Sequence, residues 1–349
     1  MENKEVNEKS EVFPTISVGI VALNEEHYLP DMLACLDSQD YPHRLIQIVL
    51  VDSGSDDATP QIMADFKTKD NDFDSIVLLS NPGKTVPKGW NVFLGSATGD
   101  VIVRVDAHAR IPSNFLRQIA AVLAEGENVV GGPRPTVTPK NASDWQRVLH
   151  AAEESLFGAS IAAYRGKRKA ITKTNQYVHS IFHPGYRRSV IDEVGPFNEE
   201  LTRTEDNDYS YRIRQAGYQI RFDPRIYSEQ IIRPSLPAMA KQKHANGYWI
   251  GRTLFVQPGC VELYHLVPAV FVAAVGSAAA LSLGGIKWPL RAILGSYTFA
   301  DAALSAAALP EIKPHTRKSL WLPAIFPILH IGYGLGTLKG IAEGLFKKK

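Results

Sequence analysis

Residues 46–59 read IQIVLVDSGSDDAT, an apolar run that ends in an acidic loop containing one glycine. Residues 16–26, ISVGIVALNEE, and residues 101–108, VIVRVDAH, repeat this order of an apolar run followed by polar side chains. Short apolar runs bounded by such loops are typical of buried strands. Helical spacing follows the first two runs, at residues 28–36 and 60–66. The alternation predicts an α/β fold, in which a mostly parallel sheet is covered by helices on both faces.

The polar side chains that end these runs should meet at one edge of the sheet, because ligands bind outside the carboxyl ends of parallel strands. Asn24 and Glu25 follow the first run, Asp52 the second, and Asp106 and His108 the third. A single cluster of this kind is more often ordinary turn chemistry, and an Asp-Ser-Gly-Ser loop also serves as a turn and helix cap. Three clusters at successive strand ends predict a shared binding site.

The Asp106-x-His108 pair predicts a metal site, because two side chains one residue apart after a buried strand can both face an ion that holds a diphosphate. The alternative is a capped strand end, but Arg104 and Asp106 place charge at the end of an apolar strand, which needs a reason. An imidazole ligand favours Mn²⁺ somewhat over Mg²⁺. We therefore expect a divalent metal, Mn²⁺ or Mg²⁺, at Asp106 and His108.

A second acidic cluster, Thr204-Glu205-Asp206-Asn207-Asp208, precedes a predicted helix over residues 209–216. Carboxylates at a helix N-terminus complement the helix dipole, and this structural role is the better interpretation of Asp208. Glu205 and Asp206 are instead candidates for a general base, since a hydroxyl nucleophile needs a carboxylate that accepts its proton.

The composition argues against several other classes of protein. The 349 residues carry 38 Lys and Arg against 36 Asp and Glu, a formal net charge of +2 without a long basic stripe, so no nucleic-acid partner is expected. Cys35 and Cys260 have no metal-like spacing and suit a reducing cytosol. Residues 1–14 lack the apolar region of a secretory signal and are predicted to form a disordered tail.

The C-terminal third is apolar enough to enter a membrane. Leu263 to Leu283 contains no Asp, Glu, Lys or Arg and is long enough to cross a hydrocarbon core of about 30 Å, and Leu290 to Leu309 can return across it. Basic residues that follow the second span place that loop on the cytoplasmic side: Lys313, His315, Arg317 and Lys318. Leu320 to Phe346 is interrupted by prolines and glycines, so a re-entrant or interfacial helix pair is expected there rather than a third crossing.

Taken together, these residues resemble the inverting GT-A glycosyltransferases of family 2. The resemblance extends from Pro14 to about Pro234, and it rests on Val18-x-Ile20-x-Ala22-x-Asn24-Glu25, Asp52-Ser53-Gly54-Ser55-x-Asp57-x-Thr59, Asn91 with Gly95, Ala97-x-Gly99-Asp100, Asp106-x-His108, Tyr186-Arg187-Arg188 with Gly195-x-Phe197, and Thr204-Glu205-Asp206. It implies a Rossmann-like GT-A domain over residues 15–235. The residues that follow predict an amphipathic interfacial linker over 236–260 and membrane-associated helices over 261–349. Within the family the chain looks most like the ExoA-type succinoglycan glucosyltransferases.

The resemblance also implies roles for individual residues. The nucleotide-sugar pocket would be formed by Asn24, Glu25, Asp52, Ser53, Gly54, Asp57, Lys84 and Asp106. Asp106 and His108 would hold the metal, although His108 stands where most members of the family have a second Asp. Asp206 of the Glu205–Asp206 pair would be the general base. The acceptor side would include Tyr186, Arg187, Thr204 and Trp249.

The function implied is transfer of a sugar, glucose from UDP-glucose, to a saccharide linked to undecaprenyl diphosphate in exopolysaccharide biosynthesis. The enzyme would be bound to the inner membrane, with its catalytic domain facing the cytoplasm. One alternative is a processive polysaccharide synthase, but residues 241–249 lack the Arg-Trp pair of the Gln-x-x-Arg-Trp motif found there in such synthases. Another is a non-catalytic membrane scaffold that keeps the fold, against which the retained Asp52, Asp106 and Asp206 argue.

Overall fold

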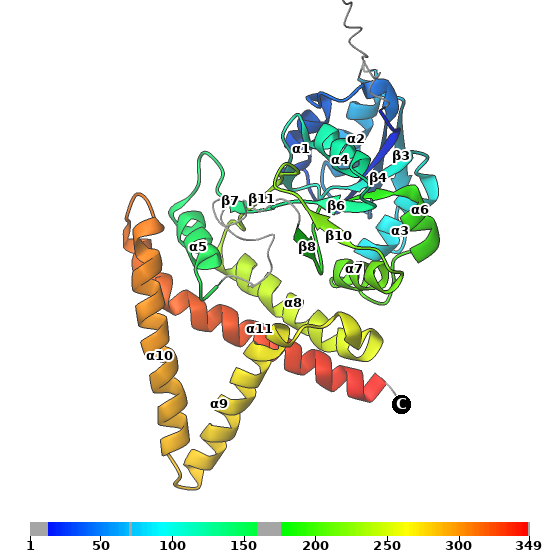
Figure 1. Ribbon diagram of the computed structural model, residues 1–349. Coiled ribbons are helices and arrows are strands. Elements are labelled where there is room, and N and C mark those ends of the chain that lie inside the picture. The colour runs from blue at the N-terminus through cyan, green and yellow to red at the C-terminus, as the bar shows by residue number, and fades with distance from the viewer. Residues whose placement is uncertain (1–12, 70–71, 159–175, 348–349) are drawn as a thin grey trace, which may run out of the picture.

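The structure, a computed structural model, describes residues 13–69, 72–158 and 176–347. It consists of an α/β unit built on a large sheet and a group of long helices at the C-terminal end (Figure 1). Most of the predicted N-terminal tail lies outside the described residues.

The large sheet begins with parallel strands, as the sequence predicts. Its strand order is β3-β2-β1-β4-β9-β6-β10-β8. The parallel strands of its first half are β1 (Ile16–Ala22), β2 (Ile46–Asp52), β3 (Ser75–Ser80) and β4 (Val101–Arg104). The second half is mixed and contains β9 (Gly185–Arg187), antiparallel to both of its neighbours, then β6 (Val129–Gly131), β10 (Ile220–Phe222) and the antiparallel β8 (Gln176–Val178). The prediction of a Rossmann-like, mostly parallel sheet is confirmed.

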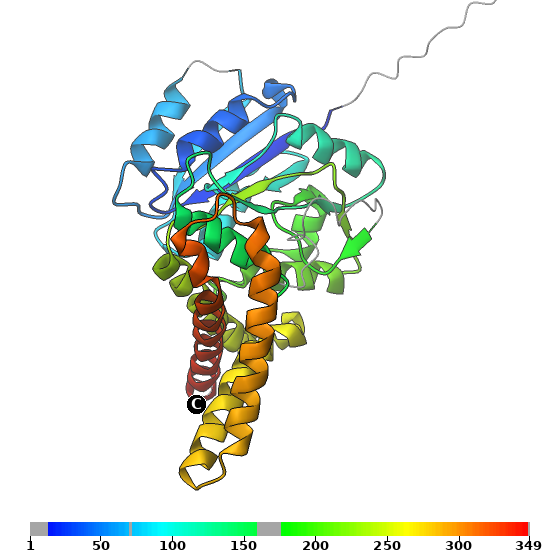
Figure 2. The ribbon, with the colours of Figure 1, turned by 90° about the vertical axis from the view of Figure 1, so that its left-hand side faces the viewer.

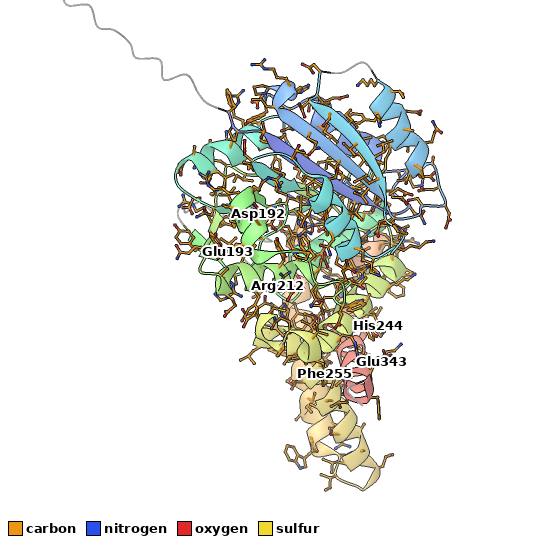
Figure 3. All side chains as sticks on the ribbon, turned by 90° about the vertical axis from the view of Figure 1, so that its right-hand side faces the viewer. Asp192, Glu193, Arg212, His244, Phe255 and Glu343 are labelled. Carbon is orange, nitrogen blue, oxygen red and sulfur yellow. The ribbon has the colours of Figure 1, made fainter. Side chains whose placement is uncertain are left out.

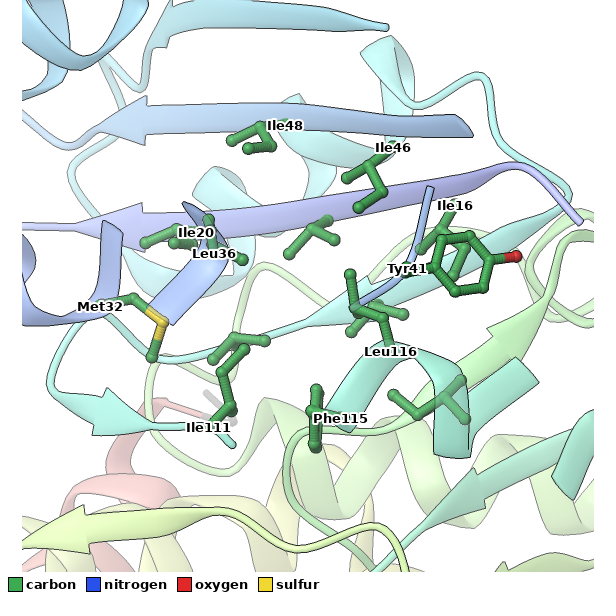
Figure 4. Packing of buried hydrophobic residues seen from close by; sticks show 14 of the residues in the cluster. Ile16, Ile20, Met32, Leu36, Tyr41, Ile46, Ile48, Ile111, Phe115 and Leu116 are labelled. Carbon is green, nitrogen blue, oxygen red and sulfur yellow. The ribbon is translucent and has the colours of Figure 1, made fainter. Parts of the chain in front are cut away.

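Helices cover both faces of this sheet, because side chains along a buried strand alternate between the faces. Ile46 and Ile48 of β2 pack on one face with Met32 and Phe115 (Figure 4), whereas Val49 packs on the other face. The helices on the first face are α1 (Leu29–Asp37), α2 (Thr59–Thr68) and α4 (Phe115–Ala124). Those on the second face are α3 (Val86–Ser96), α6 (Arg188–Val194) and α7 (Glu205–Gln215).

A small sheet and one helix lie between the large sheet and the C-terminal helices. The small sheet pairs β5 (Ala109–Arg110), β11 (Glu229–Ile231) and β7 (Thr136–Val137). The helix α5 (Asp144–Glu154) places Val148 and Leu149 in a core cluster that also contains Ile325 and Phe326. This cluster joins the α/β unit to the helices that follow.

The C-terminal helices have two orientations. α8 (Leu236–Val256) and α11 (Leu322–Lys347) lie side by side next to the α/β unit, whereas α9 (Val267–Leu283) and α10 (Trp288–Ala308) form a hairpin that projects away from it (Figures 1 and 2). Three helical segments of the described residues are long and apolar enough to cross a membrane, namely Leu263–Leu283, Trp288–Glu311 and Arg317–Phe346. Their apolar windows are 11 %, 17 % and 39 % buried, so protein covers the third most.

α11 is one continuous helix, and the predicted interruption of residues 320–346 is therefore wrong. Pro323 stands in the first turn, where it removes no helical hydrogen bond, and Pro327 lies inside the helix. The glycines bring α11 close to α8, because a Cβ added at Gly340 would overlap the carbonyl oxygen of Tyr248. Small residues that let two helix backbones approach are typical of membrane-helix packing.

Side-chain contacts also join α8 and α11. Tyr248 Oη donates a hydrogen bond to Glu343 Oε2 at 2.6 Å, and His244 Nδ1 lies 3.0 Å from the carbonyl oxygen of Gly332. Figure 3 labels His244 and Phe255 of α8 and Glu343 of α11, and the Phe255 ring lies against Gly344, the residue after Glu343. Most of the segment predicted as an interfacial linker is thus a helix packed along its partner.

Candidate active site

The loops that follow β1 and β2 leave the sheet side by side, because these strands pair in parallel as far as Asp52. Asn24 has a left-handed φ of 57°, and its Oδ1 accepts a hydrogen bond from the N–H of Asp56 at 2.8 Å. The Asp52 carboxylate accepts hydrogen bonds from the N–H groups of Gly54 and Ser55, each at 3.1 Å. Asn24 and Asp52 therefore shape these loops.

Other residues predicted for the nucleotide pocket lie in the same loops or contact them. Asp57 accepts a hydrogen bond from the N–H of Thr59 at 2.9 Å, and Ser53 is buried. Lys84 has a left-handed φ of 55°, and its side chain lies over Gly54, with Cε 3.1 Å from where a Cβ would be. The Lys84 ammonium group is therefore close to the loop that follows β2.

Asp106 follows β4 and lies beside cationic and imidazole groups. Its Oδ2 is 3.2 Å from His183 Nε2 and 3.8 Å from Arg134 Nη1. Burial acts to raise the pKa of Asp106, but His183, His108 and Arg134 outweigh it and hold that pKa well below its ordinary value. Asp106 is therefore a carboxylate at neutral pH.

His108 is oriented by a second carboxylate. Its Nδ1 lies 3.0 Å from Glu25 Oε1, which leaves Nε2 as the nitrogen able to bind an ion. A metal-binding histidine typically gives its other ring N–H to a carboxylate in this way. The side chains of Asp106 and His108 are 31 % and 22 % exposed, so both remain accessible to a ligand. Asp106 and His108 could hold Mn²⁺ or Mg²⁺ only together with further ligands. No group of three or more His, Cys, Asp or Glu in the described part of the chain could hold an ion.

Glu205, which is buried, and Asp206, which is half-buried, form an acidic pair at the N-terminus of α7. Glu205 Oε1 lies 3.9 Å from Arg104 Nη2. Burial and the neighbouring charge of Asp206 raise the pKa of Glu205 to about 8, although Arg104 opposes the increase. Burial also raises the pKa of Asp206, with Arg104 again opposing. Near neutral pH the pair can therefore hold one proton and one negative charge, the arrangement needed to accept a second proton.

Asp208 has the structural role that the sequence indicates. Its Oδ2 is 3.0 Å from Arg212 Nε, one turn further along α7, and its side chain is almost completely buried. The ion pair within the helix accounts for this carboxylate without a ligand.

Of the residues predicted for the acceptor side, Arg187 lies apart from the acidic pair. Arg187 donates hydrogen bonds to the carbonyl oxygens of Glu127 and Leu123 and pairs with Val101, at the amino end of β4. The antiparallel direction of β9 thus carries it away from Asp106, contrary to the predicted placement.

Two of the other three acceptor-side predictions lie beside the acidic pair, because Tyr186 interacts with Arg104, Asp206 and Glu205, and Thr204 directly precedes Glu205. Tyr186 is buried, with its ring edge-on to that of Tyr209. Thr204 is buried and shares a 2.6 Å hydrogen bond with the hydroxyl of Thr253 in α8. Trp249 is a partly exposed residue of α8.

Sequence reasoning missed three residues of this site. His183 and Arg134, which flank Asp106, come from loops far away in the chain, and no spacing rule connects them to it. Arg104 stands out in the sequence as a charge in an apolar strand, but the sequence gives it no partner. A charged residue within an apolar segment is the signal that could have found Arg104.

Residues 17–195 match the family described as Glycosyl transferase family 2. The chain belongs to this family. AglE, a glycosyltransferase of Haloferax volcanii, is 24 % identical over 230 residues, which cover 66 % of this chain and 71 % of that protein. A dolichyl N-acetyl-alpha-D-glucosaminyl phosphate 3-beta-D-2,3-diacetamido-2,3-dideoxy-beta-D-glucuronosyltransferase of Methanococcus voltae is 22 % identical over 340 residues, 94 % of this chain and 98 % of that one. The succinoglycan biosynthesis protein ExoA of Rhizobium meliloti is 26 % identical over 206 residues, 58 % of this chain and 59 % of that one.

Among solved structures, the mannosyltransferase PcManGT from Pyrobaculum calidifontis, in complex with GDP-Man and Mn²⁺, has a TM-score of 0.56 at 17 % identity. The match covers 94 % of this chain and 88 % of that one. At this identity the likeness shows the fold alone.

Membership of the family confirms the predicted glycosyltransferase activity and the GT-A type of fold. ExoA is one relative among several, so the ExoA-type specificity does not follow from the family.

Proposed function

We propose that this family 2 glycosyltransferase transfers a single sugar, glucose from UDP-glucose, to a saccharide carried by undecaprenyl diphosphate in exopolysaccharide biosynthesis. The observation that carries the proposal is the grouping of Asp106 with the Glu205–Asp206 pair: Arg104, at the end of the strand that Asp106 follows, lies 3.9 Å from Glu205 Oε1. In such a site the Asp106 carboxylate would lie on the side of the diphosphate, and the acidic pair would accept the proton.

The assignment of the sugar donor rests on the loops that follow the carboxyl ends of β1 and β2. We assign the nucleotide to Asn24, Asp52 and the loop braced by Asp57, with Lys84 near the diphosphate. UDP-glucose follows from the resemblance to ExoA-type enzymes, and GDP-mannose is the competing donor because PcManGT was solved with it. The acceptor half draws support from the Methanococcus voltae relative, whose name specifies a dolichyl-phosphate-linked sugar as its substrate.

The reaction would be one in-line displacement. Asp206 accepts the proton of the acceptor hydroxyl as its oxygen bonds to the anomeric carbon, and the bond from that carbon to the UDP oxygen breaks on the opposite side. The configuration inverts, and UDP leaves as an anion. A divalent metal held by Asp106 and His108 Nε2 would neutralise charge on the leaving diphosphate. Glu25 would keep the His108 ring turned toward that ion.

The membrane arrangement is part of the same proposal. The α9–α10 hairpin would cross the bilayer, since both helices are apolar and largely uncovered, and α8 with α11 would lie at its surface. The hairpin turn, residues 284–287, lies at the end farthest from the α/β unit (Figure 1), and its one basic residue is Lys287. Three basic residues follow α10 at the near end, namely Lys313, Arg317 and Lys318. The positive-inside rule then places the catalytic domain, residues 15–235, in the cytoplasm.

The proposed function is tested by incubating membranes that contain the full chain with radiolabelled UDP-glucose, UDP-N-acetylglucosamine or GDP-mannose. We expect label from UDP-glucose to enter a product that organic solvent extracts, and membranes with Asp206→Asn to lack it. Label found only in free sugar would contradict a lipid-linked acceptor, and a long labelled polymer would indicate the processive alternative.

We predict that turnover requires a divalent cation. EDTA should abolish transfer, and Mn²⁺ should restore it better than Mg²⁺. Glu25→Gln should weaken Mn²⁺ affinity in the presence of UDP by about 10- to 100-fold, the usual effect of losing the carboxylate behind a histidine ligand. Electron paramagnetic resonance of free Mn²⁺ measures this affinity independently of turnover. Undiminished turnover in EDTA would contradict the metal assignment.

A further inference from the structure

Arg104 is a buried arginine that the proposed reaction does not use. It ends the apolar strand β4 and is only 8 % exposed. Its guanidinium carbon lies 4.3 Å from the centroid of the Trp90 ring and 4.6 Å from that of Phe197. Two aromatic rings at these distances favour the cation and restrict its position.

The fixed guanidinium faces the acidic pair of α7. Arg104 Nη2 is 3.9 Å from Glu205 Oε1, beyond hydrogen-bond distance, so the contact is electrostatic. Within the described residues, neither Arg104 Nε nor Glu205 Oε2 has a hydrogen-bond partner. The other charged or titratable groups that interact with the pair are Asp106, Arg134, Tyr186, Arg203 and Cys260.

We infer that Arg104 is a positioning residue for the proposed base: its guanidinium, held by Trp90 and Phe197, keeps one carboxylate of the Glu205–Asp206 pair ionised. The inference rests on the proposed role of Asp206. Arg104 acts through the acidic pair and is not assigned to the reacting atoms.

The balance of charges in the site supports this assignment. Burial raises the pKa of both carboxylates, and for Asp206 the Arg104 charge is the strongest influence in the opposite direction. Glu205, whose pKa burial and the Asp206 charge raise to about 8, titrates together with Asp206, and the nearby Arg104 cation favours the ionised form of the pair. Without Arg104 the pKa of the base rises, so a larger fraction of the enzyme is protonated and inactive at neutral pH. The acid limb of the pH–activity profile must then move to higher pH.

The test is the pH dependence of kcat/KM for the full chain in native membranes, with UDP-glucose as donor. We expect Arg104→Gln to move the acid midpoint up by about one unit or more, because loss of a nearby charge changes a buried pKa by that amount. For a shift of one unit, activity at pH 7 should fall about two- to fivefold and largely recover near pH 9. Arg104→Lys keeps the charge and should move the midpoint less. The affinity for UDP with Mn²⁺ should stay within about twofold of wild type in each variant, since Arg104 acts on the base.

Arg221 offers a matched control, because it is also a buried arginine paired with carboxylates, at Glu127 and Asp223. Arg221→Gln should lower thermal stability and leave the acid midpoint in place. If Arg104→Gln does not fold, Phe197→Leu loosens one contact of the guanidinium and should move the midpoint in the same direction by less.

An unchanged midpoint in Arg104→Gln, or in Phe197→Leu if the first variant is unfolded, overturns the inference. Asp206→Asn separates this failure from failure of the proposed function. If Asp206→Asn keeps wild-type turnover, the proposed base is wrong whatever Arg104 does. If Asp206→Asn is inactive while the Arg104 midpoint is unchanged, only the role of Arg104 is rejected.

Discussion

Asp206→Asn is expected to lower kcat for sugar transfer by about 10²- to 10⁴-fold, the usual contribution of a general base. Asparagine keeps the shape of aspartate but cannot accept the proton, so the loss appears in the transition state and not in donor binding. The affinity for UDP should therefore remain within about twofold. Steady-state transfer assays and a UDP titration measure the two quantities separately.

Two neighbouring carboxylates of α7 serve as controls. Asp208→Asn breaks the ion pair with Arg212 and should lower thermal stability with little loss of kcat. Glu205→Gln should cost less activity than Asp206→Asn, because burial raises the pKa of Glu205 to about 8 and the group is already neutral at pH 7. Wild-type kcat in Asp206→Asn together with no activity in Glu205→Gln would move the base to Glu205.

Removal of the outer part of the membrane hairpin is expected to abolish most transfer to lipid while sparing donor binding. The change replaces residues 273–294, at the far end of α9 and the start of α10, by a short Gly/Ser linker. It retains Phe271 and Tyr297, whose rings stack at 4.7 Å nearer the helix base. The shortened hairpin is too short to cross a core of about 30 Å.

The enzyme should then be released from membranes by a carbonate wash. Transfer to membrane acceptor should fall about 10²-fold or more, because the acceptor hydroxyl is no longer held near the site. UDP binding should be unchanged, since the loops after β1 and β2 are untouched. A hairpin of the original length built from Leu and Ala should restore both anchoring and transfer. Full transfer by the released enzyme would instead indicate a soluble acceptor.

The apolar runs of the sequence determined the parallel strands that begin the catalytic domain, β1 to β4, and not the shorter strands that complete the sheet. Ile16–Ala22 and Ile46–Asp52 are strands because their side chains are buried on both faces, a condition that a mostly apolar run indicates. The polar side chains of Ser17 and Gln47 are buried there because they hydrogen-bond to each other. The position of Asp52 and Asp106 at one edge follows from the same pattern, since parallel strands bring their carboxyl ends together. Local sequence was sufficient because each of these features depends on a few consecutive residues.

Contacts between distant parts of the chain were decided only by the tertiary structure. The sequence places Arg187 beside Tyr186 in one motif, but the antiparallel entry of β9 turns it toward the carbonyl groups of Leu123 and Glu127.

The glycines of α11 read as helix breakers in the sequence, and they become a packing surface only because α8 lies against them. The neighbours of Asp106 and of the acidic pair likewise come from separate loops and strands: His183, Arg134 and Arg104. The pKa of a buried carboxylate depends on which charges surround it in space, and the order of residues along the chain does not record those distances.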